Sequence, residues 1–168
     1  VYLLLLKAID TTFELTIVTQ INPSENTKLE GLYIAGDAFC TQCEAQGFRR
    51  ITYYLDRPDV MAIYTTKVIA DRDKYPFLLS NGNKIDSGEL DGNRHFATWQ
   101  DPHKKPAYLF ALVAGDFDLL TGEYETRSGR KVALEFFVDK GNKEKATYAL
   151  GALQRSMKWD EERFGLEY

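Results

Sequence analysis

Two cysteines and a neighbouring glutamate have the residue types and the spacing that could support chemistry in this chain of 168 residues. Cys40 and Cys43 are separated by two residues, a spacing found in zinc sites and in thiol redox pairs. A structural zinc site needs a second pair of ligands, but His95 and His103 have seven residues between them, which fits no common pattern. A redox pair should begin a helix after a parallel strand, whereas the sequence around these cysteines is antiparallel in character. The spacing therefore favours two half-buried cysteines over a metal or redox centre.

Gln42 and Glu44 form a second candidate site. If this stretch is extended, residues two apart share a face, so the two side chains would project together. A carboxylate beside an amide acceptor suits the ammonium group of a ligand. From the pattern alone, however, a solvated glutamate on a loop is the stronger interpretation. The sequence contains no Gly-rich phosphate loop, no Gly-x-Ser-x-Gly and no His-Glu-x-x-His, so we find no catalytic residue and no metal ligand in it.

Composition and charge limit the classes of partner. The chain is 44% hydrophobic and 27% charged, which is typical of a soluble globular protein. Its formal net charge is −4, and it has no block of Lys or Arg longer than two residues, which argues against nucleic acid as a partner. The apolar run at 1–6 is far shorter than the roughly 20 residues that span a bilayer and lacks the features of a signal peptide. Only two cysteines are present, so we expect a cytoplasmic protein without a membrane partner.

The first two-thirds of the chain predict an antiparallel, sandwich-like sheet domain. Clean alternation of apolar and polar residues from Thr11 to Ile21 predicts a half-buried strand. Asn-Gly and Asp-Gly pairs at 80–83 and 90–93 predict tight hairpins. At 107–114 the sequence is apolar on both faces, which predicts a strand covered on both sides. Further strands are expected at 29–35, 62–70, 85–90 and 94–100.

The last third predicts a hairpin followed by one long helix. The hairpin strands are 117–125 and 131–138, and the helix should run from Asn142, as N-cap, to about Phe164, with Gly165 as its stop. An apolar stripe at helical spacing contains Ala146, Ala149, Leu150, Leu153, Met157 and Phe164. Such a stripe needs a partner surface, and the sequence begins with Val and ends shortly after the helix. We therefore expect a fragment of a larger protein.

Long runs of this sequence closely resemble the amino-terminal domain of M1-family zinc aminopeptidases. The most specific run is 29–73, which contains Cys40-Thr41-Gln42-Cys43-Glu44. Further matching runs are YPFLLSNGN, WQDP, YLFALVAGDFD, TRSGR and SMKWDEERFGLEY. Where the family usually has Phe-Pro-Cys-Phe-Asp-Glu-Pro, residues 52–58 keep Asp56 and Pro58 but carry Arg57 in place of the Glu. That departure is typical of a bacterial branch of the family.

The resemblance implies a fold and roles for two residues. It implies a mainly β, antiparallel, saddle-like amino-terminal domain over 1–116, with 117–168 supplying the opening hairpin and helix of a truncated, thermolysin-like catalytic domain. The Glu matching Glu44 binds the α-ammonium group of the substrate, together with a second Glu from a Gly-x-Met-Glu-Asn motif. The Gln matching Gln42 lines the pocket for the first side chain. Zinc and its general base belong to a His-Glu-x-x-His motif, which this chain lacks.

The sequence thus predicts part of a zinc aminopeptidase that removes amino-terminal residues from peptides. Its expected partners are a peptide with a free amino terminus and the remainder of the catalytic domain, and the segment alone should be inactive. The alternative is a stand-alone, non-catalytic β-sandwich binding module. A thiol redox protein built on Cys40 and Cys43 is a third interpretation, and the spacing supports it least.

Overall fold

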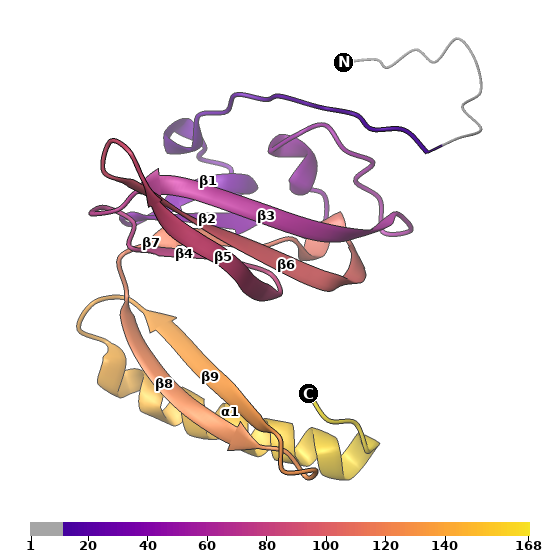
Figure 1. The fold of residues 1–168 in the computed structure, drawn as a ribbon, viewed down its shortest axis with the longest axis vertical. Coiled ribbons are helices and arrows are strands. Elements are labelled where there is room, and N and C mark those ends of the chain that lie inside the picture. Colours follow the sequence, from indigo (N-terminus) through magenta and orange to yellow (C-terminus); the bar gives the residue numbers. More distant parts are fainter. Residues whose placement is uncertain (1–11) are drawn as a thin grey trace.

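The computed structural model describes residues 12–168, in which two antiparallel sheets are followed by a hairpin and one long helix (Figure 1). The first sheet has the order β1 (Gly31–Ala35), β2 (Ala38–Gln42), β7 (Leu112–Gly115) and β4 (Phe77–Ser80). The second sheet has the order β3 (Met61–Asp71), β6 (Arg94–Pro106) and β5 (Asn83–Leu90). The hairpin strands are β8 (Asp118–Glu125) and β9 (Lys131–Val138), and the helix is α1 (Lys143–Phe164). Three short 3-10 helices are η1 (Pro23–Glu25), η2 (Phe48–Arg50) and η3 (Ala107–Leu109). The mainly β fold expected from the sequence is confirmed.

The two sheets pack face to face around a shared apolar core. Leu78 of β4, Ala114 of β7 and Ala97 of β6 are buried in contact with one another. Partly buried side chains surround them, among them Phe39, Val68, Tyr75 and Trp99. The indole Nε1 of Trp99 donates a hydrogen bond of 2.9 Å to the carbonyl of Leu78, so this side chain ties the second sheet to the first. The sandwich is therefore held by apolar packing and by a polar contact inside it.

The strand predicted for Thr11 to Ile21 is not formed. Thr11 lies outside the described residues, and 12–21 are extended but pair with no strand of the described chain. Alternation describes a chain that could form a ladder, but a strand also needs a neighbour to accept its backbone hydrogen bonds. The apolar row of this segment is exposed, with Phe13 57% and Leu15 53% accessible. A period-two pattern was therefore not sufficient to predict a strand.

The two predicted tight turns have different outcomes. The turn at 90–93 joins β5 to β6, which pair antiparallel as expected. The turn at 80–83 joins β4 to β5, which lie in different sheets, so it carries the chain between layers and does not close a hairpin. Gly82 has φ +84°, and a Cβ atom there would overlap the carbonyl oxygen of Gln100. The glycine is needed for this close approach as well as for its backbone conformation.

The apolar stretch 107–114 is shorter as a strand than predicted. Its first part forms the 3-10 turn η3, and only Leu112–Gly115 forms strand β7. The turn reverses the chain as it leaves β6 in the second sheet and enters β7 in the first. Strand β7 lies between β2 and β4, so both its edges are paired, whereas Leu112 and Val113 are only half-buried and the predicted covering of both faces is incomplete. Apolar content alone could not separate the turn residues from the strand residues.

The hairpin and the helix agree with the sequence prediction. Helix α1 packs along β8 and β9, where Leu150 contacts Gly122 (Figure 1). Gly165 has φ +70° and its N–H donates to the Glu161 carbonyl at 3.0 Å, as expected of a C-terminal stop. Asn142 does occupy the N-cap position, but its side chain makes no capping hydrogen bond and accepts instead from Lys145 Nζ.

The apolar stripe of α1 is only partly covered by the hairpin. Ala146 is buried and Leu150 is half-buried, whereas Leu153 is 37% and Phe164 is 62% exposed. The hairpin therefore covers only part of the stripe: Ala149, Leu153 and Phe164 stay exposed, and Met157, like Leu150, is half-buried. None of the helices within 12–168 has the length and apolar content needed to cross a membrane, and the apolar run at 1–6 lies outside the described residues.

We predict that Trp99→Phe lowers the free energy of unfolding by about 1–3 kcal/mol, because the Leu78 carbonyl inside the sandwich loses its hydrogen-bond donor. Urea unfolding followed by circular dichroism measures the change. Trp159→Phe is the matched control, since Trp159 is 56% exposed and donates no such bond in the described structure. Equal stability of the two variants would show that the indole contact does not hold the sheets together.

Candidate functional site

Glu44 lies in a sharp turn immediately after β2. Gln42 is the last residue of the strand, Cys43 is only 3% exposed, and Glu44 returns to the surface. The N–H of Gly47 donates to the Cys43 carbonyl at 2.8 Å and closes the turn. The peptide bond between Glu44 and Ala45 is cis. Burial of the preceding side chain therefore fixes where the Glu44 carboxylate emerges.

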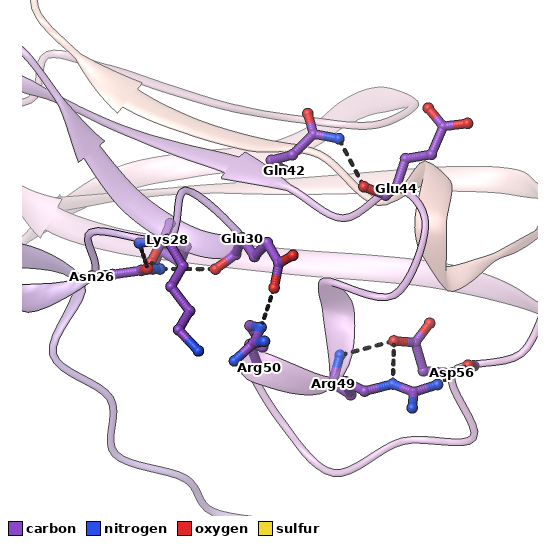
Figure 2. A network of polar contacts seen from close by, with 9 residues as sticks. Asn26, Lys28, Glu30, Gln42, Glu44, Arg49, Arg50 and Asp56 are labelled. Atoms are coloured by element: carbon purple, nitrogen blue, oxygen red, sulfur yellow. Dashed lines mark hydrogen bonds and ion pairs between the residues drawn. The ribbon is translucent and has the colours of Figure 1, made fainter.

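Gln42 and Glu44 project from the same side of the strand end (Figure 2), although Glu44 lies in a turn and not on the extended stretch that the sequence prediction assumed. The Gln42 amide Nε2 donates to the backbone carbonyl of Glu44 at 3.1 Å. The amide therefore contacts the main chain of Glu44 and leaves its carboxylate untouched. Both side chains are exposed, and the contact stabilises the turn that presents them.

The Glu44 carboxylate has no hydrogen bond or ion pair with any residue in 12–168. The residue lines an open hollow together with Glu30, Gln46, Gly47, Arg49 and Arg50, and its carboxylate points away from both arginines (Figure 2). Both arginines of this hollow are already paired with other carboxylates. Arg49 Nε lies 3.2 Å from Asp56 Oδ2, and Arg50 Nε lies 2.5 Å from Glu30 Oε2 (Figure 2). The negative charge of Glu44 is therefore available to a cationic ligand.

The turn rests on a small aromatic core. Phe48, the first residue of η2, is buried with Cys43 and Ala107, and Ile51, Tyr64 and Phe110 pack against them. The Phe48 ring meets the Phe110 ring edge to face, with centroids 5.2 Å apart. A Cβ atom at Gly47 would overlap the Gln42 carbonyl oxygen, so only glycine permits this close approach of the chain.

The two thiols are neutral groups with a packing role. Burial, and next the charge of Asp56, raises the pKa of Cys43 to about 11. Burial and the charge of Asp139 also raise the pKa of Cys40. A catalytic or redox thiol needs the opposite, a lowered pKa in an electropositive setting. The structure therefore favours packed cysteines over the thiol redox protein, with Cys40 half-buried as expected and Cys43 fully buried.

The two histidines do not join the site. His95 Nε2 lies 2.8 Å from the Tyr75 carbonyl, and neither His95 nor His103 lines the hollow around Glu44. In the described part of the chain, no three His, Cys, Asp or Glu side chains are grouped so that they could hold a metal ion. Residues 12–168 therefore do not fit the zinc that the family resemblance implies.

Sequence reasoning missed the groups that support the turn. Asp56 was noted only as a retained motif residue, yet it is buried and bonded to Arg49. Gly47 and Phe48 lie within the matching run but were assigned no role. The only available signal was the retention of Asp56, because its burial depends on tertiary contacts that spacing does not show.

Comparison with known proteins shows the family of this chain. Residues 5–109 match the family described as the Peptidase M1 N-terminal domain. The chain belongs to the M1 peptidase family. Aminopeptidase N of Escherichia coli (strain K12) is 66% identical and Aminopeptidase N of Haemophilus influenzae is 64% identical, each over 156 residues that cover 93% of this chain. The chain spans 18% of the length of each of these relatives.

A solved structure supports the same assignment. The crystal structure of Legionella pneumophila aminopeptidase A in complex with aspartic acid matches with a TM-score of 0.83 and 44% sequence identity. The match covers 86% of this chain and 17% of that one. The resemblance drawn from the sequence is therefore confirmed at the level of family and fold. The role of Glu44 remains a prediction.

We predict that iodoacetamide labels Cys43 about 100-fold more slowly in the folded chain than in urea at pH 8, because its pKa is raised from 9.0 to about 11. The rate should increase with pH up to about 11 in the folded chain, but level off near 9 in the unfolded one. Mass spectrometry of the Cys43 peptide measures both rates. Equal rates in the two states would contradict a neutral, buried thiol.

We also predict that the 168-residue chain binds no stoichiometric zinc, because its described residues offer no ligand set. The measurement is elemental analysis after equilibration with zinc and dialysis. The double variant Cys40→Ser, Cys43→Ser serves as the control for weak thiol binding. One tightly held zinc per chain, lost in the double variant, would contradict the prediction and revive the Cys-x-x-Cys site.

Proposed function

We propose that the complete protein is a zinc aminopeptidase that removes amino-terminal residues from peptides, and that this segment binds the α-ammonium group of the substrate through Glu44. The observation that carries the proposal is the exposed Glu44 carboxylate, which has no polar partner within 12–168 and lies on a turn between the buried residues Cys43 and Gly47. The identity of 66% to an Aminopeptidase N supports it, since the match covers 93% of this chain.

A fixed carboxylate at this position would act as an end stop for the substrate. An ammonium group forms charge-assisted hydrogen bonds with a carboxylate, and these are about twice as strong as neutral ones. Only a peptide with a free amino terminus could make them, which accounts for exopeptidase specificity. Holding the amine would also orient the first peptide bond toward the catalytic groups, and correct orientation lowers the barrier by several kcal/mol in general.

Gln42 would form part of the pocket for the first side chain of the substrate. It is exposed, it lies beside Glu44, and its contact with the Glu44 carbonyl holds it close to the anchor (Figure 2). The Legionella pneumophila relative was solved with aspartic acid, which is an amino acid with a free α-amine. We propose a ligand of the same class here, namely the amino-terminal residue of a peptide.

We further propose that 1–116 form an amino-terminal β domain and that 117–168 begin the catalytic domain. The packing supports this division, because the two sheets share one core whereas α1 lies on β8 and β9. Zinc would be held by residues outside the described segment, since residues 12–168 do not fit it. The complete protein would act in the cytoplasm in peptide catabolism, with the rest of the catalytic domain as the partner of this segment.

We predict that Glu44→Ala in the complete protein lowers kcat/KM by a factor equivalent to about 2–4 kcal/mol of transition-state stabilisation, because the substrate amine loses its charge partner. Glu44→Gln should lose most of the same transition-state stabilisation, since glutamine keeps the shape of the side chain and removes its charge. Steady-state kinetics on an aminoacyl substrate measures the effect, with zinc content and thermal stability checked for each variant.

Asp37→Asn is the matched control for the change of net charge. Asp37 is exposed in the turn between β1 and β2, at the opposite end of β2 from Glu44. We expect its kcat/KM to match that of the wild type. A Glu44→Gln variant with unchanged kcat/KM would remove Glu44 from the substrate site.

A further inference from the structure

The short helix η2, which follows the turn of Glu44, has no cap from its own N-cap residue. That position is Gly47, and no side-chain capping bond is made from it. In most helices the N-cap side chain accepts from the backbone N–H of the second or third helical residue. A serine, threonine, aspartate or asparagine at this position would bring a Cβ atom into overlap with the Gln42 carbonyl oxygen. The glycine that the turn requires therefore leaves the first turn of η2 to be capped from elsewhere.

Asp56 supplies the missing cap from the loop that follows η2. Its Oδ2 atom accepts from the backbone N–H of Arg49, the second residue of η2, at 3.0 Å. This is the hydrogen bond that an N-cap side chain would make. The same oxygen accepts from Arg49 Nε at 3.2 Å, and a terminal nitrogen of Arg49 donates to the Asp56 carbonyl at 2.7 Å (Figure 2). The Asp56 side chain is only 3% exposed, so water competes little for these bonds.

The loop that carries Asp56 is itself packed against η2. The Tyr54 ring meets the Phe48 ring edge to face, with centroids 5.3 Å apart. The Asp56 N–H donates to the Tyr54 carbonyl at 2.9 Å, and the Ile51 N–H donates to the Phe48 carbonyl at 2.9 Å. Helix η2 and the loop after it thus form one closed unit, in which the Asp56 carboxylate meets the first turn of the helix.

Gly47 joins this capped helix to the turn that presents Glu44. Its carbonyl accepts from the Arg50 N–H at 3.0 Å, and its own N–H donates to the Cys43 carbonyl at 2.8 Å. Only residues 44–46 lie between the two partners of the second bond. A displacement of the first turn of η2 therefore moves Gly47 and, with it, one end of the turn that carries Glu44. The connection from Asp56 to Glu44 runs through the main chain.

We propose that Asp56 is a positioning residue for the amine anchor, because its cap on η2 holds the turn in the conformation in which Glu44 meets the substrate amine. The inference rests on the proposed function of Glu44 and adds a residue that never touches the substrate. Without the cap, the turn has to become ordered when the amine binds, and the conformational entropy lost at that step weakens binding. A ligand without an α-amine does not use the anchor, so its binding does not depend on the cap.

The test compares phenylalanine with phenylpropionate, which lacks the α-amine, as inhibitors of the complete protein. The ratio of their inhibition constants should favour phenylalanine by about tenfold or more in the wild type. Asp56→Ala should lower this ratio about fivefold, within the range that the loss of a helix cap produces. Asp56→Asn keeps an oxygen that can accept from the Arg49 N–H, and Arg49→Met keeps that N–H, so both should lower the ratio less. In the Glu44→Gln background, Asp56→Ala should cause no further fall.

Asp59→Ala is the matched control, because the Asp59 carboxylate pairs at the surface with Arg57 at 2.9 Å and makes no hydrogen bond or ion pair with η2 in the described chain. Its ratio should equal that of the wild type. A purely structural role of Asp56 would lower the melting temperature of Asp56→Ala and leave the ratio unchanged, since only folded protein binds the inhibitors.

An unchanged ratio in Asp56→Ala, or a further fall in the Glu44→Gln background, overturns the proposal. If Asp56→Ala does not fold, Asp56→Asn decides by the same criterion. A Glu44→Gln protein that keeps the wild-type ratio would instead overturn the proposed function.

Discussion

The site depends on the burial of one side chain next to the glutamate. Cys43 follows the last residue of β2 and enters the core with Phe48 and Ala107, so the chain must turn sharply to bring Glu44 back to the surface. Gly47 permits this turn, and its N–H closes it on the Cys43 carbonyl. A carboxylate on a freely moving loop would lose conformational entropy on binding a ligand, whereas this turn is already ordered.

The first sheet connects this turn to the rest of the chain. Strand β2 pairs with β7, and β7 leads through Gly115 into the hairpin β8–β9. Phe77 of β4 meets Phe137 of β9 with ring centroids 5.2 Å apart, and Lys140 Nζ lies 2.8 Å from Asp116 at the connection. Packing and charge therefore link the sheet that carries Glu44 to the hairpin and helix that we assign to the start of the catalytic domain.

Sequence reasoning succeeded where a pattern extended over many residues. Strand β3, the β5–β6 hairpin, the β8–β9 hairpin and helix α1 were all expected from periodicity and turn residues. It failed for 12–21, where alternation lacked a partner strand. It also failed at 107–114, where a turn and a strand share the same apolar composition. No strand was predicted for β2 or β4, which have five and four residues, whereas β1 lies within the predicted strand 29–35.

The candidate site could be predicted only in part. Residue patterns alone favoured a solvated Glu44, and its proposed role came from the family resemblance. The supporting groups were invisible for a physical reason. Asp56 lies in the loop after η2 and becomes important only because folding buries it against Arg49. Residue spacing predicts which side chains are neighbours on one helix or strand, whereas the Arg49–Asp56 contact joins η2 to the loop that follows it.

The most direct test of the account is to compare the binding of an amino acid with that of its analogue lacking the α-amine. Inhibition constants for both ligands are measured on the complete wild-type protein and on Glu44→Gln. The account predicts that the wild type prefers the amine-bearing ligand by about tenfold or more, and that Glu44→Gln loses this preference. A preference that stays the same in Glu44→Gln would contradict the assignment of Glu44 as the amine anchor.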